Sequence, residues 1–195
     1  MRFFRENSDS IVKLYINQIG VAIFAMFLYT AAAAIKADGT ATLLMKVGIS
    51  VFSVLFYFCL LYTVAWEIGA KDKIRIDAGR MEEKKIKGLK LGLFANVPNF
   101  VFVGLALVLF LIYLISGAEA LYTIFGILNG LFRIFVSMYL GIIQGLTESL
   151  TGNLDLAIET LLYIVFSAVA AFITYLSYLM GLKEKRLFPS VPKKK

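Results

Sequence analysis

Four long apolar runs limit what this chain can fold into. They cover about residues 12–35, 45–67, 97–116 and 158–182, and roughly 20 apolar residues are enough to span a bilayer core of about 30 Å. A chain of 195 residues that is 60% hydrophobic could not bury this much apolar surface in one soluble core. The sequence therefore predicts an all-α polytopic membrane protein, with residues 1–195 forming a single membrane domain.

A fifth apolar segment, at about residues 121–149, is less easily assigned. It is long enough to cross, but Arg133 lies inside it, and a charged residue near a helix centre costs about 2.5–3.5 kcal/mol on insertion scales. Both a spanning and a re-entrant arrangement remain open. We expect a helical segment that is embedded in the membrane.

The basic residues give a preference between these arrangements. All but three of the 20 lysines and arginines lie before residue 14, between residues 71 and 90, or after residue 182. Such residues collect on the cytoplasmic side. A non-crossing fifth segment puts all three groups on one side, whereas a crossing one separates the tail, residues 183–195. We favour the first arrangement, with both termini cytoplasmic and the protein in a bacterial cytoplasmic membrane.

The segment from residue 68 to 95 is predicted to be a cytoplasmic basic loop ending in an interfacial helix. It begins in a motif-like stretch, WEIGAKDKIRIDAGR, to which we attach no activity. We expect its lysines to contact anionic lipid headgroups, each contributing about 1 kcal/mol; they are Lys84, Lys85, Lys87 and Lys90. No aromatic residues alternate with them, so nucleic acid is not an expected partner.

A line of polar residues runs through the fifth segment at intervals of three or four once Gly141 is included, which predicts one face of a single helix. Its members are Asn129, Arg133, Ser137, Gln144 and Glu148. One interpretation is a solute path in which Arg133 attracts anions. The other is an interhelical network in which Arg133 pairs with Glu119, Glu148 or Glu159.

A second candidate site lies where the third apolar run begins. Pro98 cannot donate a backbone hydrogen bond, so it kinks or restarts the helix between Asn96 and Asn99. The free backbone groups of a broken helix could bind a ligand. The alternative is a plain proline kink with asparagine caps.

The residue content argues against catalysis. The chain has no histidine and one cysteine, which excludes histidine-ligated zinc and Ser–His or Cys–His nucleophile pairs. No motif with a known catalytic mechanism is present, and we expect no metal and no cofactor. The sequence predicts a non-enzymatic subunit or accessory component of a larger membrane assembly, such as a transport or export system, with other membrane subunits or copies of itself as partners. The alternative is a small oligomeric transporter or channel that uses the polar line.

Overall fold

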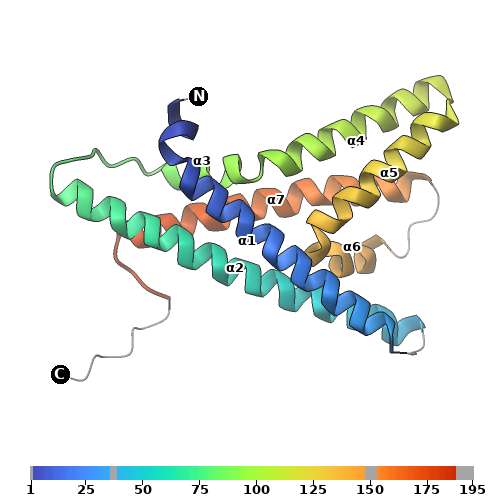
Figure 1. The fold of residues 1–195 in the computed structure, drawn as a ribbon, viewed down its shortest axis with the longest axis horizontal. Coiled ribbons are helices and arrows are strands. Elements are labelled where there is room, and N and C mark those ends of the chain that lie inside the picture. Colours follow the sequence, from blue (N-terminus) through green and yellow to red (C-terminus); the bar gives the residue numbers. More distant parts are fainter. Residues whose placement is uncertain (1, 36–38, 148–152, 188–195) are drawn as a thin grey trace.

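A computed structural model describes residues 2–35, 39–147 and 153–187, and the regular elements in these ranges are all helical. Figure 1 shows their arrangement. The elements are α1 (Arg2–Ala33), α2 (Gly39–Asp77), α3 (Lys87–Ala95), α4 (Val97–Ser116), α5 (Glu119–Phe135), the 3-10 turn η1 (Ser137–Tyr139), α6 (Leu140–Thr147) and α7 (Asn153–Leu182).

Four of these helices are long and apolar enough to cross a membrane, which confirms the predicted fold class. The candidate spans are Phe3–Ala32, Ala41–Asp77, Val97–Ser116 and Ile158–Leu182. A fifth would require α5 and η1–α6 to act as one span, although these two parts meet at an angle of 87°. The described chain therefore contains four candidate spans and one broken, apolar helical segment.

The second span is longer than predicted. We expected it to end near residue 67 and to be followed by a loop, whereas α2 continues to Asp77. Ion pairs one turn apart hold the exposed face of this extension, with Lys71 2.6 Å from Glu67 and Lys73 2.6 Å from Asp77. Its other face packs against α7. The expected loop is thus helical up to Asp77.

Glycines bring α2 and α7 together near the last turn of α7. A Cβ atom on Gly69 would collide with the carbonyl oxygen of Tyr178, and one on Gly181 with the carbonyl oxygen of Trp66. Without side chains at these positions the two backbones can touch, which is how helices pack closely in membranes. The helices α1 and α3 then pack against this pair.

The helices α4 and α5 form a hairpin that extends away from α1 and α2 (Figure 1). Gly117 ends α4 in the left-handed backbone conformation, at φ 67°. Its N–H donates a hydrogen bond to the carbonyl oxygen of Tyr113 at 2.8 Å. Aromatic pairs then join the two helices, with ring centroids 5.0 Å apart for Tyr113 and Tyr122 and 5.2 Å apart for Phe110 and Phe125. The outer part of the hairpin has a small apolar core of its own.

The first and last described residues lie at the same end of the bundle, which we name the terminal end. The ring of Phe3 lies 5.6 Å from that of Phe94 in α3. Beyond α7, the carbonyl oxygen of Lys185 accepts a hydrogen bond from Trp66 Nε1 at 2.7 Å. The opposite end, where α1 ends and α2 begins, is named the distal end.

The bent pair formed by α5 and η1–α6 begins and ends at the distal end. It starts directly after α4, which runs from the terminal to the distal end. After the bend, Gly141 in α6 lies against the backbone of Lys46, close to the beginning of α2. Helix α7 then starts and runs back to the terminal end (Figure 1). The bent pair therefore has the form of either a broken span or a re-entrant segment.

Candidate functional site

Arg133 lies in the last turn of α5 and forms an ion pair with Glu159 of α7. Its Nε donates to Glu159 Oε1 at 2.9 Å, and Nη2 donates to Glu159 Oε2. Tyr163 adds a third hydrogen bond to the same carboxylate, with its hydroxyl 2.9 Å from Oε1. Glu159 is only 5% exposed, and a buried carboxylate is stable when its oxygens are hydrogen-bonded in this way. Glu159 is one of the three partners that the sequence left open.

Two other members of the polar line also bond to neighbouring helices. Asn129 Nδ2 donates to Thr160 Oγ1 in α7 at 2.8 Å. The hydroxyl of Ser137 donates to the carbonyl oxygen of Ala22 in α1. Near the same bend, the backbone N–H of Gly141 lies 2.7 Å from Ser50 Oγ in α2. These contacts fix the bent pair against three helices.

The prediction that the polar line occupies one face of a single helix is wrong. The helix ends at Phe135, Val136 adopts φ −120° and ψ 18°, and the chain turns by 87° before α6. The spacing could not show this, because the bend depends on contacts distant in sequence, such as the hydrogen bond from Ser137 to α1. Gln144 lies beyond the bend on α6, and Glu148 lies outside the described residues.

The bend leaves a pocket of about 350 Å³ at the surface, which we name the lateral pocket. It brings three members of the polar line to one site despite the broken helix, namely Arg133, Ser137 and Gln144. The other lining residues come from α1, α2 and the bent pair: Met26, Tyr29, Thr30, Lys46, Ile134 and Leu140. A mainly apolar pocket with a few polar groups is the usual form of a ligand site.

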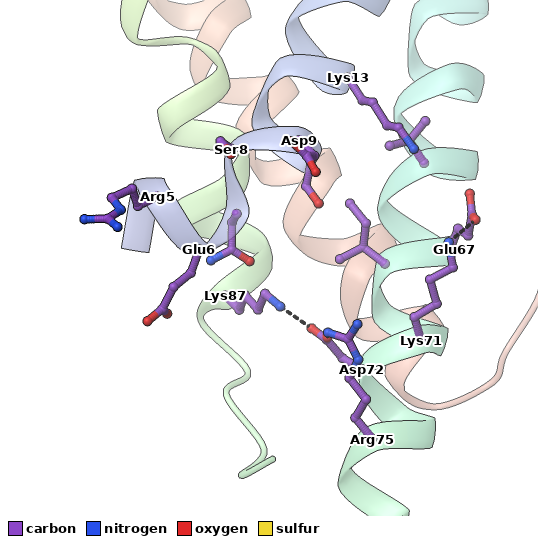
Figure 2. Close-up of a pocket in the computed structure, with 14 residues that line it drawn as sticks. Arg5, Glu6, Ser8, Asp9, Lys13, Glu67, Lys71, Asp72, Arg75 and Lys87 are labelled. Atoms are coloured by element: carbon purple, nitrogen blue, oxygen red, sulfur yellow. Dashed lines mark hydrogen bonds and ion pairs between the residues drawn. The ribbon is translucent and has the colours of Figure 1, made fainter. Parts of the chain in front are cut away.

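A second polar group lies at the terminal end, around Asp72 of α2 (Figure 2). Asp72 is 2% exposed. Its Oδ2 accepts hydrogen bonds from Lys87 Nζ at 2.7 Å and from the Tyr178 hydroxyl at 2.9 Å. In Figure 2 the guanidinium of Arg75 lies beside the same carboxylate, with Nη1 4.0 Å from Oδ1. This Asp72 cluster joins α2, α3 and α7.

A polar cavity of about 270 Å³ adjoins the Asp72 cluster. The first turns of α1 form one wall, and Figure 2 shows Asp9 and Lys13 above the cluster while Arg5 points away. Lysines and arginines alternate with acids along this wall and along α2. Five basic and four acidic side chains line the cavity, so most of its charges offset one another.

Of the four lysines expected at the membrane surface, Lys87 is placed differently. Its side chain is only 11% exposed, because it turns inward to Asp72. Lys84 and Lys85 are exposed on the loop before α3, and Lys90 lies with its Nζ 5.7 Å from the ring centroid of Phe3. The sequence could not show that Lys87 is buried, because its partner Asp72 lies in another helix.

The predicted helix break lies at Asn96, between α3 and α4, and Pro98 is in the first turn of α4. Asn96 Nδ2 donates to the carbonyl oxygen of Gly92 at 2.9 Å. Asn99 Nδ2 donates to Asn96 Oδ1 at 3.0 Å and lies 3.5 Å from Ser167 Oγ in α7. The side-chain amides of Asn96 and Asn99 therefore stabilise the helix break through hydrogen bonds to groups inside the protein.

Two pairs of glycines spaced four residues apart were not predicted to be packing sites, although this spacing is a known packing signal for membrane helices. In α3 the pair is Gly88 and Gly92; a Cβ on Gly92 would lie 2.7 Å from the Cα of Ala171 in α7. In α6 the pair is Gly141 and Gly145, which face the beginning of α2. Asp72 was not predicted either; its signal in the sequence is an acid surrounded by basic residues soon after an apolar span.

Within residues 2–35, 39–147 and 153–187, no three histidine, cysteine or acidic side chains lie close enough together to hold a metal ion. Comparison of the chain with protein-family models, with curated proteins and with solved structures gave no match. The fold and these two polar sites are the features of the described residues that bear on function.

Proposed function

We propose that the protein is a non-enzymatic subunit or accessory component of a larger membrane assembly, such as a transport or export system. The observation that supports this most is the uncovered surface of α4. Only 22% of the residues in an apolar 18-residue stretch of α4 are buried, whereas the corresponding share is 33% to 39% in the other three candidate spans. The exposed side chains are large and apolar, and they are Val101, Leu105, Val108, Leu111, Ile112, Leu114 and Ile115.

The hairpin is also suited to presenting this surface. Its outer part packs around Ala106, Phe110 and Phe125, separately from the main core. A preformed apolar ridge of this kind can bind a membrane helix of another protein through van der Waals packing. Lipid covers such a ridge equally well, so the experiment must detect a protein partner.

The test is purification from the native membrane in mild detergent. We expect a partner of different sequence to co-purify with the wild-type protein and to be lost from a Val108→Trp/Leu111→Trp variant of α4. The matched control is Val51→Trp/Leu55→Trp, which makes the same changes at exposed positions of α2. A homogeneous homo-oligomer would contradict the accessory role, as would equal loss of the partner in the control.

The proposed orientation places the terminal end in the cytoplasm of a bacterial cell, where anionic headgroups meet it. Its support is that the beginning of α1, the basic loop after α2 and the end of α7 all lie at this end (Figure 1). These are the three basic segments of the sequence, and basic residues favour the cytoplasmic side. A non-crossing α5–α6 would allow all three to share it.

A small oligomeric transporter or channel is the second candidate, and the lateral pocket is the observation that favours it. The pocket brings Arg133, Ser137 and Gln144 to one site. In reconstituted liposomes, Arg133→Gln/Glu159→Gln, which removes both charges of the buried ion pair together, should then abolish solute flux. Unchanged flux would remove Arg133 from any path. The hydrogen bonds of Asn129 and Ser137 to other helices weigh against a continuous polar route.

A further inference from the structure

We propose that the lateral pocket binds the anionic head of a phospholipid in the membrane leaflet at the distal end. The pocket lies between the last turns of α1, the first turns of α2 and the bend after α5. Lys46 is seven residues into α2, so it lies about 10 Å from the beginning of that helix at 1.5 Å per residue. A lysine at this depth reaches the headgroups by extending its side chain.

The charges around the pocket fit a ligand with one negative charge. Arg133 and Glu159 neutralise each other through their ion pair. Lys46 makes no ion pair with any residue in the described ranges, and none of the nine lining residues is acidic. One uncompensated positive charge therefore remains at the pocket, which matches the single charge of a phosphodiester.

Hydrogen-bond donors are available beside this charge. The Nε and Nη2 of Arg133 donate to Glu159, so only the remaining N–H groups of the guanidinium can reach a ligand. Lys46 Nζ and the side-chain amide of Gln144 make no hydrogen bond to another described residue. Arginine, lysine and amide groups around an oxyanion form charge-assisted hydrogen bonds, which are stronger than neutral ones. These three groups come from α2, α5 and α6 and converge on one pocket.

The rest of the pocket is suited to a lipid rather than to a soluble phosphate. Met26, Ile134 and Leu140 form its apolar lining. The same parts of α1 and α2 also carry large exposed apolar side chains, since Phe27 is 64% exposed and Leu44 is 66% exposed. A soluble anion gains nothing from such surface, whereas the acyl chains of a phospholipid bury it.

The test uses the full-length protein, purified in detergent, with phosphatidylglycerol and phosphatidylcholine as probes and native mass spectrometry as the measurement. The wild-type protein should retain phosphatidylglycerol in preference to phosphatidylcholine. Lys46→Gln should reduce this preference about fivefold, which corresponds to the roughly 1 kcal/mol typical of one lysine near an anionic membrane surface. Lys71→Gln, the same change at the other end of α2, should leave the preference intact.

Two further arms keep the proposal open to refutation. Lys46→Arg, which keeps the charge, should bind as the wild type does, and the labelling that follows tests the site if Lys46→Gln fails to fold. A photoreactive phosphatidylglycerol should label peptides from α1 or α6 that border the pocket. The proposal is overturned by an unchanged preference in Lys46→Gln, by equal loss in Lys71→Gln, or by labelling only elsewhere. Competition by free glycerol phosphate as strong as that by the lipid would also overturn it, by identifying a soluble ligand.

Discussion

Lys87 Nζ lies 2.7 Å from Asp72 Oδ2, and both side chains are almost fully buried. The two residues come from different helices, on either side of the loop that joins α2 to α3. The Tyr178 hydroxyl bonds to the same oxygen atom. The pair therefore ties three helices together at the terminal end.

Removing one member of this pair should lower the free energy of unfolding substantially, whereas removing both should lower it little. Asp72→Ala leaves the Lys87 charge buried without a partner, and we expect it to lower the free energy of unfolding by about 3–5 kcal/mol. The double variant Asp72→Leu/Lys87→Met removes both charges and should recover most of that loss. Thermal unfolding in detergent measures both changes. Lys71→Ala, which breaks only the exposed pair with Glu67, should cost under about 1 kcal/mol. Equal destabilisation in the single and double variants would contradict this role.

The sign of a glycine-to-alanine change should depend on the helix. Gly92→Ala places a Cβ against the backbone of Ala171, and overpacking of this kind costs about 1–3 kcal/mol. Gly104→Ala in α4 meets nothing within 4 Å and should stabilise by up to about 1 kcal/mol through helix propensity. Unfolding temperatures of the two variants compare the effects directly. If Gly92→Ala were also stabilising, the close contact between α3 and α7 would be absent.

Accessibility of single cysteines should show whether the bent pair crosses the membrane. In a Cys59→Ser background, we expect Glu119→Cys and Leu146→Cys to react with an impermeant maleimide from the same side. Arg80→Cys and Lys185→Cys should react from the opposite side, because they lie at the terminal end. Labelling of Glu119→Cys and Leu146→Cys from opposite sides would mean five crossings. It would also refute the shared orientation of the termini.

Substitution of Glu159 should destabilise the protein more than its position near the beginning of α7 suggests. Glu159→Ala removes the partner of Arg133 and of the Tyr163 hydroxyl, so we expect about 3–5 kcal/mol of destabilisation. Ile158→Ala, at the neighbouring residue, is the control. The measurement is the unfolding temperature of the purified protein. A loss no larger than that of the control would show that the ion pair contributes little to stability.

The four spans could be predicted because each is a local property of the sequence. An apolar run such as residues 97–116 specifies a membrane helix without reference to its neighbours, and its predicted bounds coincide with those of α4. The extension of α2 to Asp77 could not be predicted in this way, because a charged stretch resembles a loop until α7 and α3 cover one side of it. Burial of Asp72 depends on Lys87 and Tyr178, which lie in other helices.

In the candidate sites, too, the features that depend on local sequence could be predicted, and those that depend on tertiary contacts could not. The sequence identified Arg133 as unusual and included Glu159 among its partners, since a buried charge requires an opposite one. It predicted a straight helix where the chain bends at Val136, because a regular spacing of polar residues carries no information about tertiary contacts. The lateral pocket exists only because of that bend. Lys46, which lies outside the polar line, was therefore not a candidate.

A non-crossing α5–α6 would make the two halves of the molecule unequal. The terminal half contains α3 and parts of α1, α2, α4 and α7, whereas the distal half contains the rest of α1, α2, α4 and α7 together with α5 and α6 (Figure 1). With α5 and α6 confined to the distal half, the protein would occupy more area in that leaflet than in the other. Bending the bilayer changes the area available in each leaflet in opposite directions. The free energy of the protein in the membrane should thus depend on membrane curvature. It would be lowest in regions where the distal leaflet is expanded, and the protein would accumulate there.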